Sequence, residues 1–231
     1  FKCDWSSELV LFRSGSSSEL ISSLSARPDV DVVLVEADGS RSLPFKAPGH
    51  HEPVVPEATT ILAPIAGLNS IGQPLDEAHV HRSELAAALA QQPLGSDITP
   101  RTLARVLSHP EGGAKSRPTG ARLVPILNKT DTEDAMRDAG KAAEEMLANS
   151  TVDTVVISTM QQDPPVREAW THTAGIVLAA GKPSRFGDTK QILPWDDTNL
   201  AAHSVRVALD AGLDPVIAVL GYQAEKVEKA L

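Results

Sequence analysis

Several features that would place a protein outside the ordinary globular class are missing from this sequence. Its one cysteine, Cys3, cannot form a disulfide within the chain, and no apolar run approaches the roughly 20 residues needed to span a bilayer. Positive charge is scarce as well, since the formal net charge is -9 at pH 7. Nucleic acids and anionic membranes attract clustered lysine and arginine, so we expect neither as a partner. These absences predict a protein of the reducing cytoplasm.

The chain starts at Phe1, without a methionine or a signal-like segment, which predicts a piece of a longer protein. What is present is an ordinary composition. Of the 231 residues, 42% are hydrophobic and 22% are charged, which is enough to bury one good core or two small ones.

Short apolar runs alternate with amphipathic segments, and this alternation predicts an α/β fold with a parallel sheet covered on both faces. Helical spacing at 83–91 and 100–107 goes with predicted caps at Ser83 and Thr99. The segment 161–173, which contains two consecutive prolines, is predicted as a linker between domains 1–160 and 174–231. Strands are predicted at 9–12, 32–35, 61–65, 123–127, 155–157, 176–179 and 216–220, and further helices at 20–24, 133–149, 200–211 and 224–231.

The stretch GIVLAAGKPSRFGDTK, residues 175–190, has the residue types of an anion-binding loop. Its apolar run 176–179 predicts a short buried strand, which breaks at Gly181 into a loop that holds Lys182, Arg185 and Lys190. Glycines let backbone N–H groups approach phosphate oxygens, and the basic side chains neutralise the charge that develops when a triphosphate is attacked. This pattern indicates nucleotide chemistry.

In order, LAAG, RFG and KQILPW resemble the opening of the MobA-like nucleotidyltransferases, most closely the molybdenum cofactor cytidylyltransferases. The resemblance covers residues 175–231 and implies the N-terminal part of a Rossmann-like domain. It implies nucleotide-binding roles for Leu178, Ala179, Ala180 and Gly181, and it gives Lys190 and Arg185 catalytic roles on the phosphates. The family's magnesium-binding aspartates are expected beyond this first portion.

A second strand, in DVVLVEADGS, ends in acidic residues. The continuous β-branched run 32–35 predicts a buried strand, and Glu36 and Asp38 project from one face at its carboxyl end. Parallel sheets place ligands at this end, where an aspartate can bind magnesium, so Asp38 is a candidate metal ligand. The alternative is a turn formed by Asp38 and Gly39 beside a solvated glutamate.

Residues 35–57 together with IAGLNSIGQPLDEAHVH, LSHPEG and LNKTD resemble the YqeC family, described as an accessory factor for selenium-dependent molybdenum hydroxylases. The resemblance covers roughly residues 30–131 and implies a P-loop-NTPase-like domain. The family's glycine-rich phosphate loop, expected upstream of the strand that ends near Asp38, is missing from the sequence. This first domain is therefore predicted to be an incomplete P-loop-NTPase-like parallel sheet.

The string from Asn128 to Asp131 follows an apolar run, in which Pro125 predicts an edge strand or a bulge. An aspartate in this position can accept both donors of a guanine edge, while Asn128 and Lys129 brace the loop. The string resembles the base-selecting motif of GTPases and indicates GTP. Alternatively, Thr130 or Thr132 caps the helix that follows.

Histidines and cations offer weaker hypotheses. His50 and His51 form one cluster and His79 and His81 another, but neither has the spacing of a metal site, so ordinary loop histidines are favoured over metal ligands. Arg41 and Lys46 follow the Asp38 turn and could meet a phosphate or pterin anion, or simply be solvated.

Together the resemblances imply a nucleotidyltransferase of molybdenum cofactor maturation. It would transfer CMP from CTP to the molybdopterin cofactor with Mg²⁺ present and release pyrophosphate. The alternative is a catalytically incomplete, GTP-type accessory module whose partner is a molybdenum hydroxylase apoprotein. A third hypothesis is a fusion that binds neither nucleotide. CTP binding that depends on Lys190 favours the first hypothesis, and guanine selectivity through Asp131 favours the second.

Overall fold

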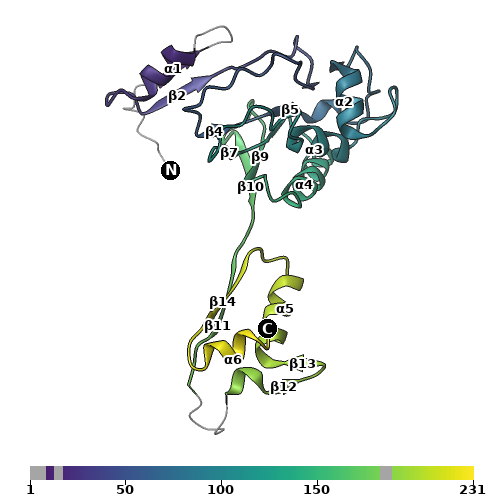
Figure 1. Cartoon of the computed structure of the whole chain (residues 1–231). Coiled ribbons are helices and arrows are strands. Elements are labelled where there is room, and N and C mark those ends of the chain that lie inside the picture. The colour runs from purple at the N-terminus through teal and green to yellow at the C-terminus, as the bar shows by residue number, and fades with distance from the viewer. Residues whose placement is uncertain (1–8, 13–17, 183–188) are drawn as a thin grey trace. The chain divides into compact units, whose positions relative to one another are not determined.

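The computed structural model describes residues 9–12, 18–182 and 189–231 of the chain. It divides into two compact units, Phe1–Thr171 and His172–Leu231, drawn in Figure 1. Each unit combines helices with small, largely parallel sheets, which confirms the predicted α/β class. In the described ranges, no helix combines the length and the apolar character needed to cross a bilayer.

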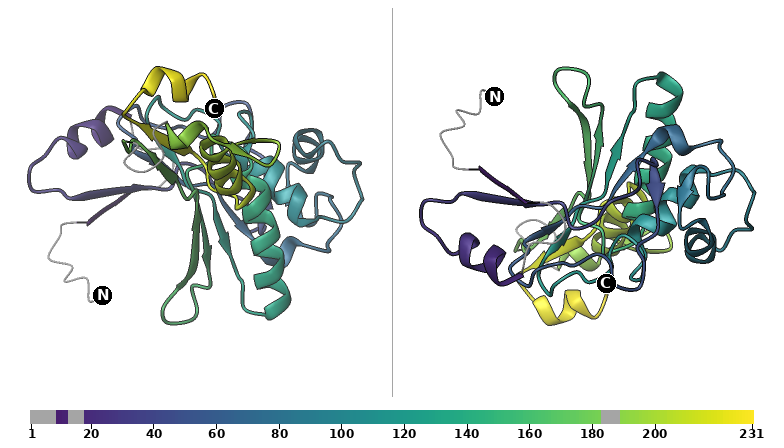
Figure 2. Two further views of the ribbon diagram at one scale, coloured as in Figure 1. Left: turned by 90° about the horizontal axis from the view of Figure 1, so that it is seen from below. Right: turned by 90° about the horizontal axis from the view of Figure 1, so that it is seen from above.

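The first unit is built around a mixed sheet with the strand order β10-β9-β8-β5, while the other strands form two-stranded pairs. β5, β8 and β9 are parallel, and β10 runs antiparallel to β9. Both views of Figure 2 show the green hairpin of β9 and β10. The elements of this unit are β1 (Leu9–Phe12), α1 (Ser18–Ser25), β2 (Val32–Val35), β3 (Phe45–Lys46), β4 (Ile61–Leu62), β5 (Ile65–Gly67), η1 (Leu68–Ser70), β6 (Val80–His81), α2 (Ser83–Ala90), α3 (Pro100–Ser108), β7 (Arg122–Leu123), β8 (Ile126–Asn128), α4 (Glu133–Leu147), β9 (Thr154–Ser158) and β10 (Val166–Thr171).

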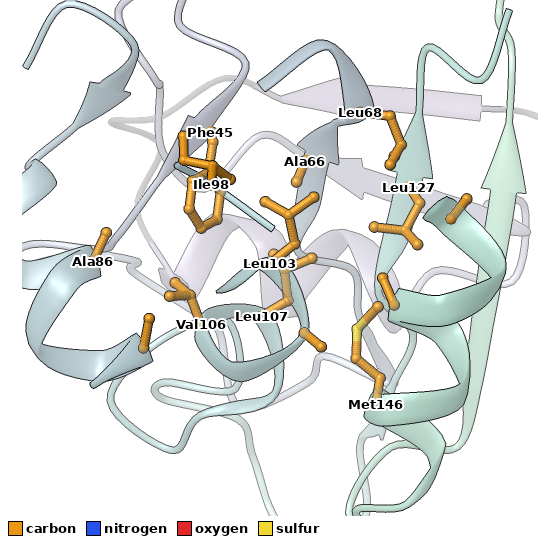
Figure 3. Packing of buried hydrophobic residues seen from close by; sticks show 14 of the residues in the cluster. Phe45, Ala66, Leu68, Ala86, Ile98, Leu103, Val106, Leu107, Leu127 and Met146 are labelled. Carbon is orange, nitrogen blue, oxygen red and sulfur yellow. The ribbon is translucent and has the colours of Figure 1, made fainter. Parts of the chain in front are cut away.

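One face of this sheet forms the core with helices α3 and α4, which lie side by side in Figure 1. Leu103 of α3 and Met146 of α4 are fully buried together with Leu127 of β8, as Figure 3 shows. The apolar residues removed from water here supply the main stabilisation of the unit.

The other face of the sheet is only partly covered, unlike the predicted sheet with two covered faces. Ile65, Ile126 and Val156 form one cross-strand row on β5, β8 and β9. Ile65 is 59% exposed, and the other two side chains are half-buried. The sequence shows that a strand is apolar, but the number of layers depends on which elements pack against it.

Helix starts in the first unit follow the predicted capping chemistry in two of three places. Thr99 and Thr102 form a capping box at α3, which confirms the cap at Thr99, and Thr132 caps α4. The predicted cap at Ser83 is wrong, because Ser83 is the first helical residue of α2 and makes no cap bond. Arg82 stands at the cap position with φ = 63°, a left-handed conformation that is costly for a residue with a side chain.

Two proline-containing segments differ from a simple strand or linker. The run 123–127 is divided at Val124 and Pro125 into β7 and β8, because a proline cannot donate to a ladder. β8 lies between β9 and β5, so the prediction of an edge strand is wrong. Within the predicted linker 161–173, residues 166–171 form β10, and the boundary between the units falls after Thr171. β10 was not apparent in the sequence because it is an exposed edge strand with charged residues in place of an apolar run.

The strand before Asp38 forms where it was predicted, but it is not buried. β2 pairs in parallel with β1, and α1 follows β1 at the predicted helical segment. Val32 and Leu34 are 38% and 48% exposed. A two-stranded sheet has few neighbours to cover its apolar side chains, so the prediction of a buried strand is wrong.

The second unit has the predicted order of strand, loop, helix, strand and helix. β11 and β14 pair in parallel, Asn199 caps α5 through the Ala202 N–H, and Gly212 (φ = 77°) follows the end of the helix. β11, α5, β14 and α6 confirm the predicted strands and helices, whereas η2, β12 and β13 were not predicted. The elements of this unit are β11 (Gly175–Ala179), η2 (Lys190–Ile192), β12 (Pro194–Trp195), β13 (Thr198–Asn199), α5 (Leu200–Asp210), β14 (Val216–Leu220) and α6 (Ala224–Glu228).

One face of the β11–β14 pair is open. Ile176 and Leu178 are 67% and 79% exposed, and they lie opposite Ile217 and Val219, which are also exposed. The prediction of a buried strand at 176–179 is therefore wrong for every second side chain. We call Ile176, Leu178, Ile217 and Val219 the open face of the second unit.

Candidate nucleotide-binding sites

The carboxyl end of β11 brings Lys190 to the glycine of the LAAG loop. Ala179 is the last, buried residue of the strand, and Ala180 and Gly181 follow on the surface. The Lys190 Nζ lies 3.9 Å from the position that a Cβ would occupy on Gly181. A flexible ammonium beside an exposed glycine backbone is suited to a phosphate group.

Gln191 holds this loop in place, a role that the sequence did not suggest. Its side chain is 4% exposed, and its Nε2 donates to the carbonyl oxygens of Ala179 (2.9 Å) and Gly181 (2.8 Å). The Gln191 Oε1 is buried and has no donor among the residues that the structure describes. The two amide bonds close the loop around the strand end, so Gln191 positions the backbone that Lys190 approaches.

The end of β14 packs tightly against the same loop. A Cβ on Gly221 would lie 2.8 Å from both the Cβ and the carbonyl oxygen of Ala180, which leaves room only for glycine. The Tyr222 N–H donates to the Ala180 oxygen at 3.3 Å. Thr189 Oγ1 also donates to Gln223 Oε1 at 2.5 Å, which ties the residue before Lys190 to the segment after β14.

The remaining sequence-predicted residues of this unit have different positions. The predicted catalytic residue Arg185 lies outside the described residues, which omit 183–188. Leu178 is in the middle of β11, with its side chain on the open face and away from the loop. Their roles, like those of Ala179, Ala180, Gly181 and Lys190, stay predictions.

A charged pair fastens the short hairpin of β12 and β13 to α5. Arg206 donates to both carboxylate oxygens of Asp197 at 3.2 Å. This bond lowers the pKa of Asp197 and raises the pKa of Arg206. Asp196 at the turn has φ = 48°, a conformation that glycine would take more easily.

In the first unit, a chain of alternating charges begins where β2 ends. Lys46 Nζ lies 2.6 Å from Asp38 Oδ2 and 3.7 Å from Glu52 Oε2. Arg82 then donates to both Glu52 oxygens, at 2.8 and 2.9 Å. The Asp38 and Lys46 side chains are only 20% and 15% exposed. The hydrogen bonds from Arg82 lower the pKa of Glu52.

Non-glycine residues in left-handed conformation cluster at the same place. Arg41, Ser42 and Arg82 have φ values of 54°, 64° and 63°. Such backbone conformations cost on the order of 1 kcal/mol each and gather at functional sites. Burial, followed by the charges of Arg82, Arg41 and Lys46, lowers the pKa of His81, so these three cations share one neighbourhood.

The histidines do not converge on a metal site. His50 and His51 face each other with 3.5 Å between their Nδ1 atoms, while the His79 Nδ1 lies 2.7 Å from Asp76. In the ranges that the structure covers, no group of three or more His, Cys, Asp or Glu side chains could hold a metal ion. Mg²⁺ usually takes one or two carboxylates together with substrate phosphates and water, so Asp38 as a magnesium ligand stays a prediction.

Residues 128–131, which are predicted to select a nucleotide base, lie at the carboxyl edge of the main sheet. Asn128 Oδ1 accepts from Ser158 Oγ at 3.2 Å, and Asp131 Oδ1 accepts from Thr159 Oγ1. Thr130 is buried and donates to the Ser158 carbonyl at 2.9 Å, so it does not cap α4. Ser158 and Thr159 were not predicted, although their place at the end of a predicted strand next to the Asn128 strand could have indicated them.

The loop that follows β2 meets this edge at Gly67. The Gly67 N–H donates to the Pro44 carbonyl at 2.7 Å. A Cβ on Gly67 would lie 3.1 Å from the Pro44 Cβ and 3.4 Å from the Lys129 Cδ. Lys129 itself has φ = 63°. The loop that contains Arg41 and residues 128–131 are therefore neighbours, and the roles of both in binding stay predictions.

Two family models match the chain. Residues 4–84 match the model described as YqeC protein, and residues 175–231 match the MobA-like NTP transferase domain. The chain thus carries a YqeC domain at its N-terminal end and a MobA-like NTP transferase domain at its C-terminal end, as the sequence resemblances predicted. The YqeC match includes Asp38 and Lys46 and ends before Asn128.

Three curated relatives are similar to parts of this chain. The uncharacterized protein YqeC of Escherichia coli (strain K12) is 30% identical over 153 residues, which cover 66% of this chain and 59% of the relative. Two proteins named bifunctional protein GlmU, from Anaeromyxobacter sp. (strain K) and Anaeromyxobacter dehalogenans, are 44% identical over 63 residues, or 26% of this chain and 13% of each relative. No solved structure matches the chain.

Proposed function

We propose that this chain acts in nucleotidyl transfer during molybdenum cofactor maturation. The match of its two ends to a YqeC domain and a MobA-like NTP transferase domain supports this proposal. The substrates would be CTP and the molybdopterin cofactor. One observation carries the proposal: Lys190 lies beside Gly181 at the carboxyl end of β11, where parallel sheets bind nucleotides.

In this reaction a phosphate oxygen of the molybdopterin cofactor attacks the α-phosphorus of CTP. The bond from the α-phosphorus to the bridging oxygen of the β-phosphate breaks, and pyrophosphate leaves with the electron pair. Negative charge increases on the phosphate oxygens, so a cation that is already in place lowers the barrier. Lys190 would hold this charge, and the backbone of Ala180 and Gly181 would orient the triphosphate.

Gln191 would keep this backbone in the required position through its bonds to Ala179 and Gly181. Gly221 contributes by leaving Ala180 room to close against β14. Among the described residues of the second unit, no three His, Cys, Asp or Glu side chains are grouped as metal ligands, and we assign no step through a metal there.

Calorimetry on the full chain tests the proposal. CTP is titrated in the presence of magnesium against the wild type, Lys190→Ala and the matched control Lys229→Ala, which removes an exposed lysine of the same unit. We expect CTP binding that Lys190→Ala weakens at least tenfold, because a charge-assisted contact with phosphate is lost. Lys229→Ala should bind like the wild type. Failure of the wild type to bind CTP at millimolar concentration would contradict the proposal.

A second candidate function is supported by the contacts around Asn128 and Asp131. These side chains are held by Ser158 and Thr159 at one sheet edge, as a binding site for a guanine base would require. The chain would then be a GTP-responsive accessory module that delivers the cofactor to a molybdenum hydroxylase apoprotein. GTP binding that Asp131→Ala abolishes and Lys190→Ala leaves unchanged would favour this function over nucleotidyl transfer.

A further inference from the structure

We propose that the side-chain carbonyl of Gln191 recognises the nucleoside part of the substrate. Its Oε1 accepts a hydrogen bond from a neutral donor of the nucleotide, which is either the exocyclic amine of the base or a ribose hydroxyl. A cytosine base carries such an amine, whereas uracil has a carbonyl oxygen in the same place. The inference rests on the nucleotidyl transfer proposed above, and it makes Gln191 a specificity-determining residue of that site.

The Gln191 Oε1 is an acceptor without a donor. The side chain is buried, with an exposed fraction of 4%, and no N–H or O–H group in the part of the chain that the structure describes reaches the oxygen. A buried carbonyl oxygen without a hydrogen bond is costly and rare in native proteins. A ligand that brings the missing donor gains this hydrogen bond at a place where bulk water does not compete.

The orientation of the Gln191 amide is fixed by its other end. Nε2 donates to the carbonyl oxygens of Ala179 at 2.9 Å and Gly181 at 2.8 Å. If the amide turned over, Oε1 would face two oxygens that also only accept, and both hydrogen bonds would be lost. The side chain therefore cannot satisfy Oε1 by turning over, and neither carbonyl can supply the donor.

This acceptor belongs to the same loop as the candidate phosphate contact. Gln191 follows Lys190 directly, and the Lys190 Nζ lies 3.9 Å from the Cβ position of Gly181, whose carbonyl Gln191 holds. The oxygens of a magnesium-bound triphosphate accept hydrogen bonds, so they suit the Lys190 ammonium and not a carbonyl oxygen. The nucleoside is the part of a nucleotide that has neutral donors. A nucleotide can therefore satisfy both groups of the loop.

Neighbouring contacts hold the acceptor in place before a ligand arrives. Thr189, directly before Lys190, is fully buried and donates to Gln223 Oε1 at 2.5 Å. A Cβ on Gly221 would lie 2.8 Å from two atoms of Ala180, so this part of the loop has no free space. A fixed acceptor discriminates against a ligand that lacks the donor, because the oxygen then stays unpaired.

Calorimetric titrations of the full chain in the presence of magnesium test the inference. The ligands are CTP, UTP, which lacks the base amine, and 2′-deoxy-CTP and 3′-deoxy-CTP, which each lack one ribose hydroxyl. We expect the wild type to bind CTP about tenfold more tightly than the analogue that lacks the donor, and Gln191→Leu to bind the two alike. The control Gln161→Leu, at an exposed glutamine of the first unit, should keep the wild-type ratio.

The ratio of the two affinities separates recognition from a structural role. A loop that loosens in Gln191→Leu weakens CTP and its analogues by the same factor, so loosening alone leaves the ratio unchanged. Gln191→Met, which is closer to glutamine in shape, is the second variant if Gln191→Leu does not fold. A preference for CTP over UTP identifies the base amine as the donor, and a preference over a deoxy analogue identifies the ribose hydroxyl.

Two results would overturn the inference while the transfer function stands. In the first, the wild type binds all four ligands alike, which means that a water molecule pairs with Oε1. In the second, the substituted chain keeps the wild-type ratio. If CTP itself does not bind at millimolar concentration, the transfer function and this inference both fail.

Discussion

The two units contain the same kinds of element but differ in how much of their apolar surface is covered. In the first unit, α3 and α4 bury Leu103, Leu127 and Met146 on one face of the main sheet. In the second unit, the strands β11 and β14 leave Leu178 79% exposed and Ile176 67% exposed. Burial of apolar side chains is the main source of folding free energy, so the units should differ in stability.

The comparison also shows that a large buried core and a well-ordered candidate site do not require each other. The second unit has a small core, yet Gln191, Gly221 and Lys190 converge on its loop through specific polar and steric contacts. The first unit has a large core, and the charged residues of its candidate site lie on β3 and in the loops around it. A site of this kind needs a rigid strand end and a few fixed contacts more than it needs a covered sheet.

The largest expected effect separates the buried leucine from the exposed one. Leu127→Ala removes a fully buried side chain and should destabilise the first unit by about 2–5 kcal/mol. Leu178→Ala, the same change on the open face, should alter stability by less than about 0.5 kcal/mol. Urea unfolding followed by circular dichroism gives both free energies. A loss above about 2 kcal/mol for Leu178→Ala would mean that the open face is covered in solution.

Most elements could be predicted because their local chemistry decides them. Thr99 before Pro100 marks the start of α3, and Gly212 ends α5, since cap and turn residues act within a few positions. Burial could not be predicted in the same way. The runs at β2 and β11 have the composition of buried strands, but whether they are covered depends on segments that pack from elsewhere.

The residues of the candidate sites also fall into those that the sequence indicates and those that it does not. Gly181 and Lys190 were predicted from an ordered motif, and the structure brings them together. Gln191 was not singled out, because a glutamine that bonds to carbonyl oxygens ten and twelve positions earlier leaves no spacing signature. The pairing of Asp131 with Thr159 depends on two strands that are distant in sequence, which only the register of β8 and β9 brings side by side.

A smaller loss of stability is expected when the loop of the second unit loses the contacts of Gln191. Gln191→Leu removes two hydrogen bonds to backbone carbonyl oxygens, one of them at the buried Ala179, so it should destabilise the unit by about 1–3 kcal/mol. CTP affinity should fall about tenfold as the Ala179–Gly181 backbone loosens. Calorimetry and urea unfolding measure the two effects. Gln161→Leu, a change at an exposed glutamine of the first unit, is the control. Unchanged CTP affinity in Gln191→Leu would contradict a positioning role.

The smallest effect concerns acid stability and should be confined to the first unit. Burial lowers the pKa of His81, so below its unfolded pKa of about 6.5 the unfolded chain binds this proton more readily than the folded one. Stability should therefore decrease as pH falls below about 6.5, and His81→Gln should flatten this slope. His203→Gln, in the second unit, is the matched control. The comparison requires urea midpoints between pH 7 and pH 5. An equal slope in wild type and His81→Gln would show that His81 does not couple folding of the first unit to pH.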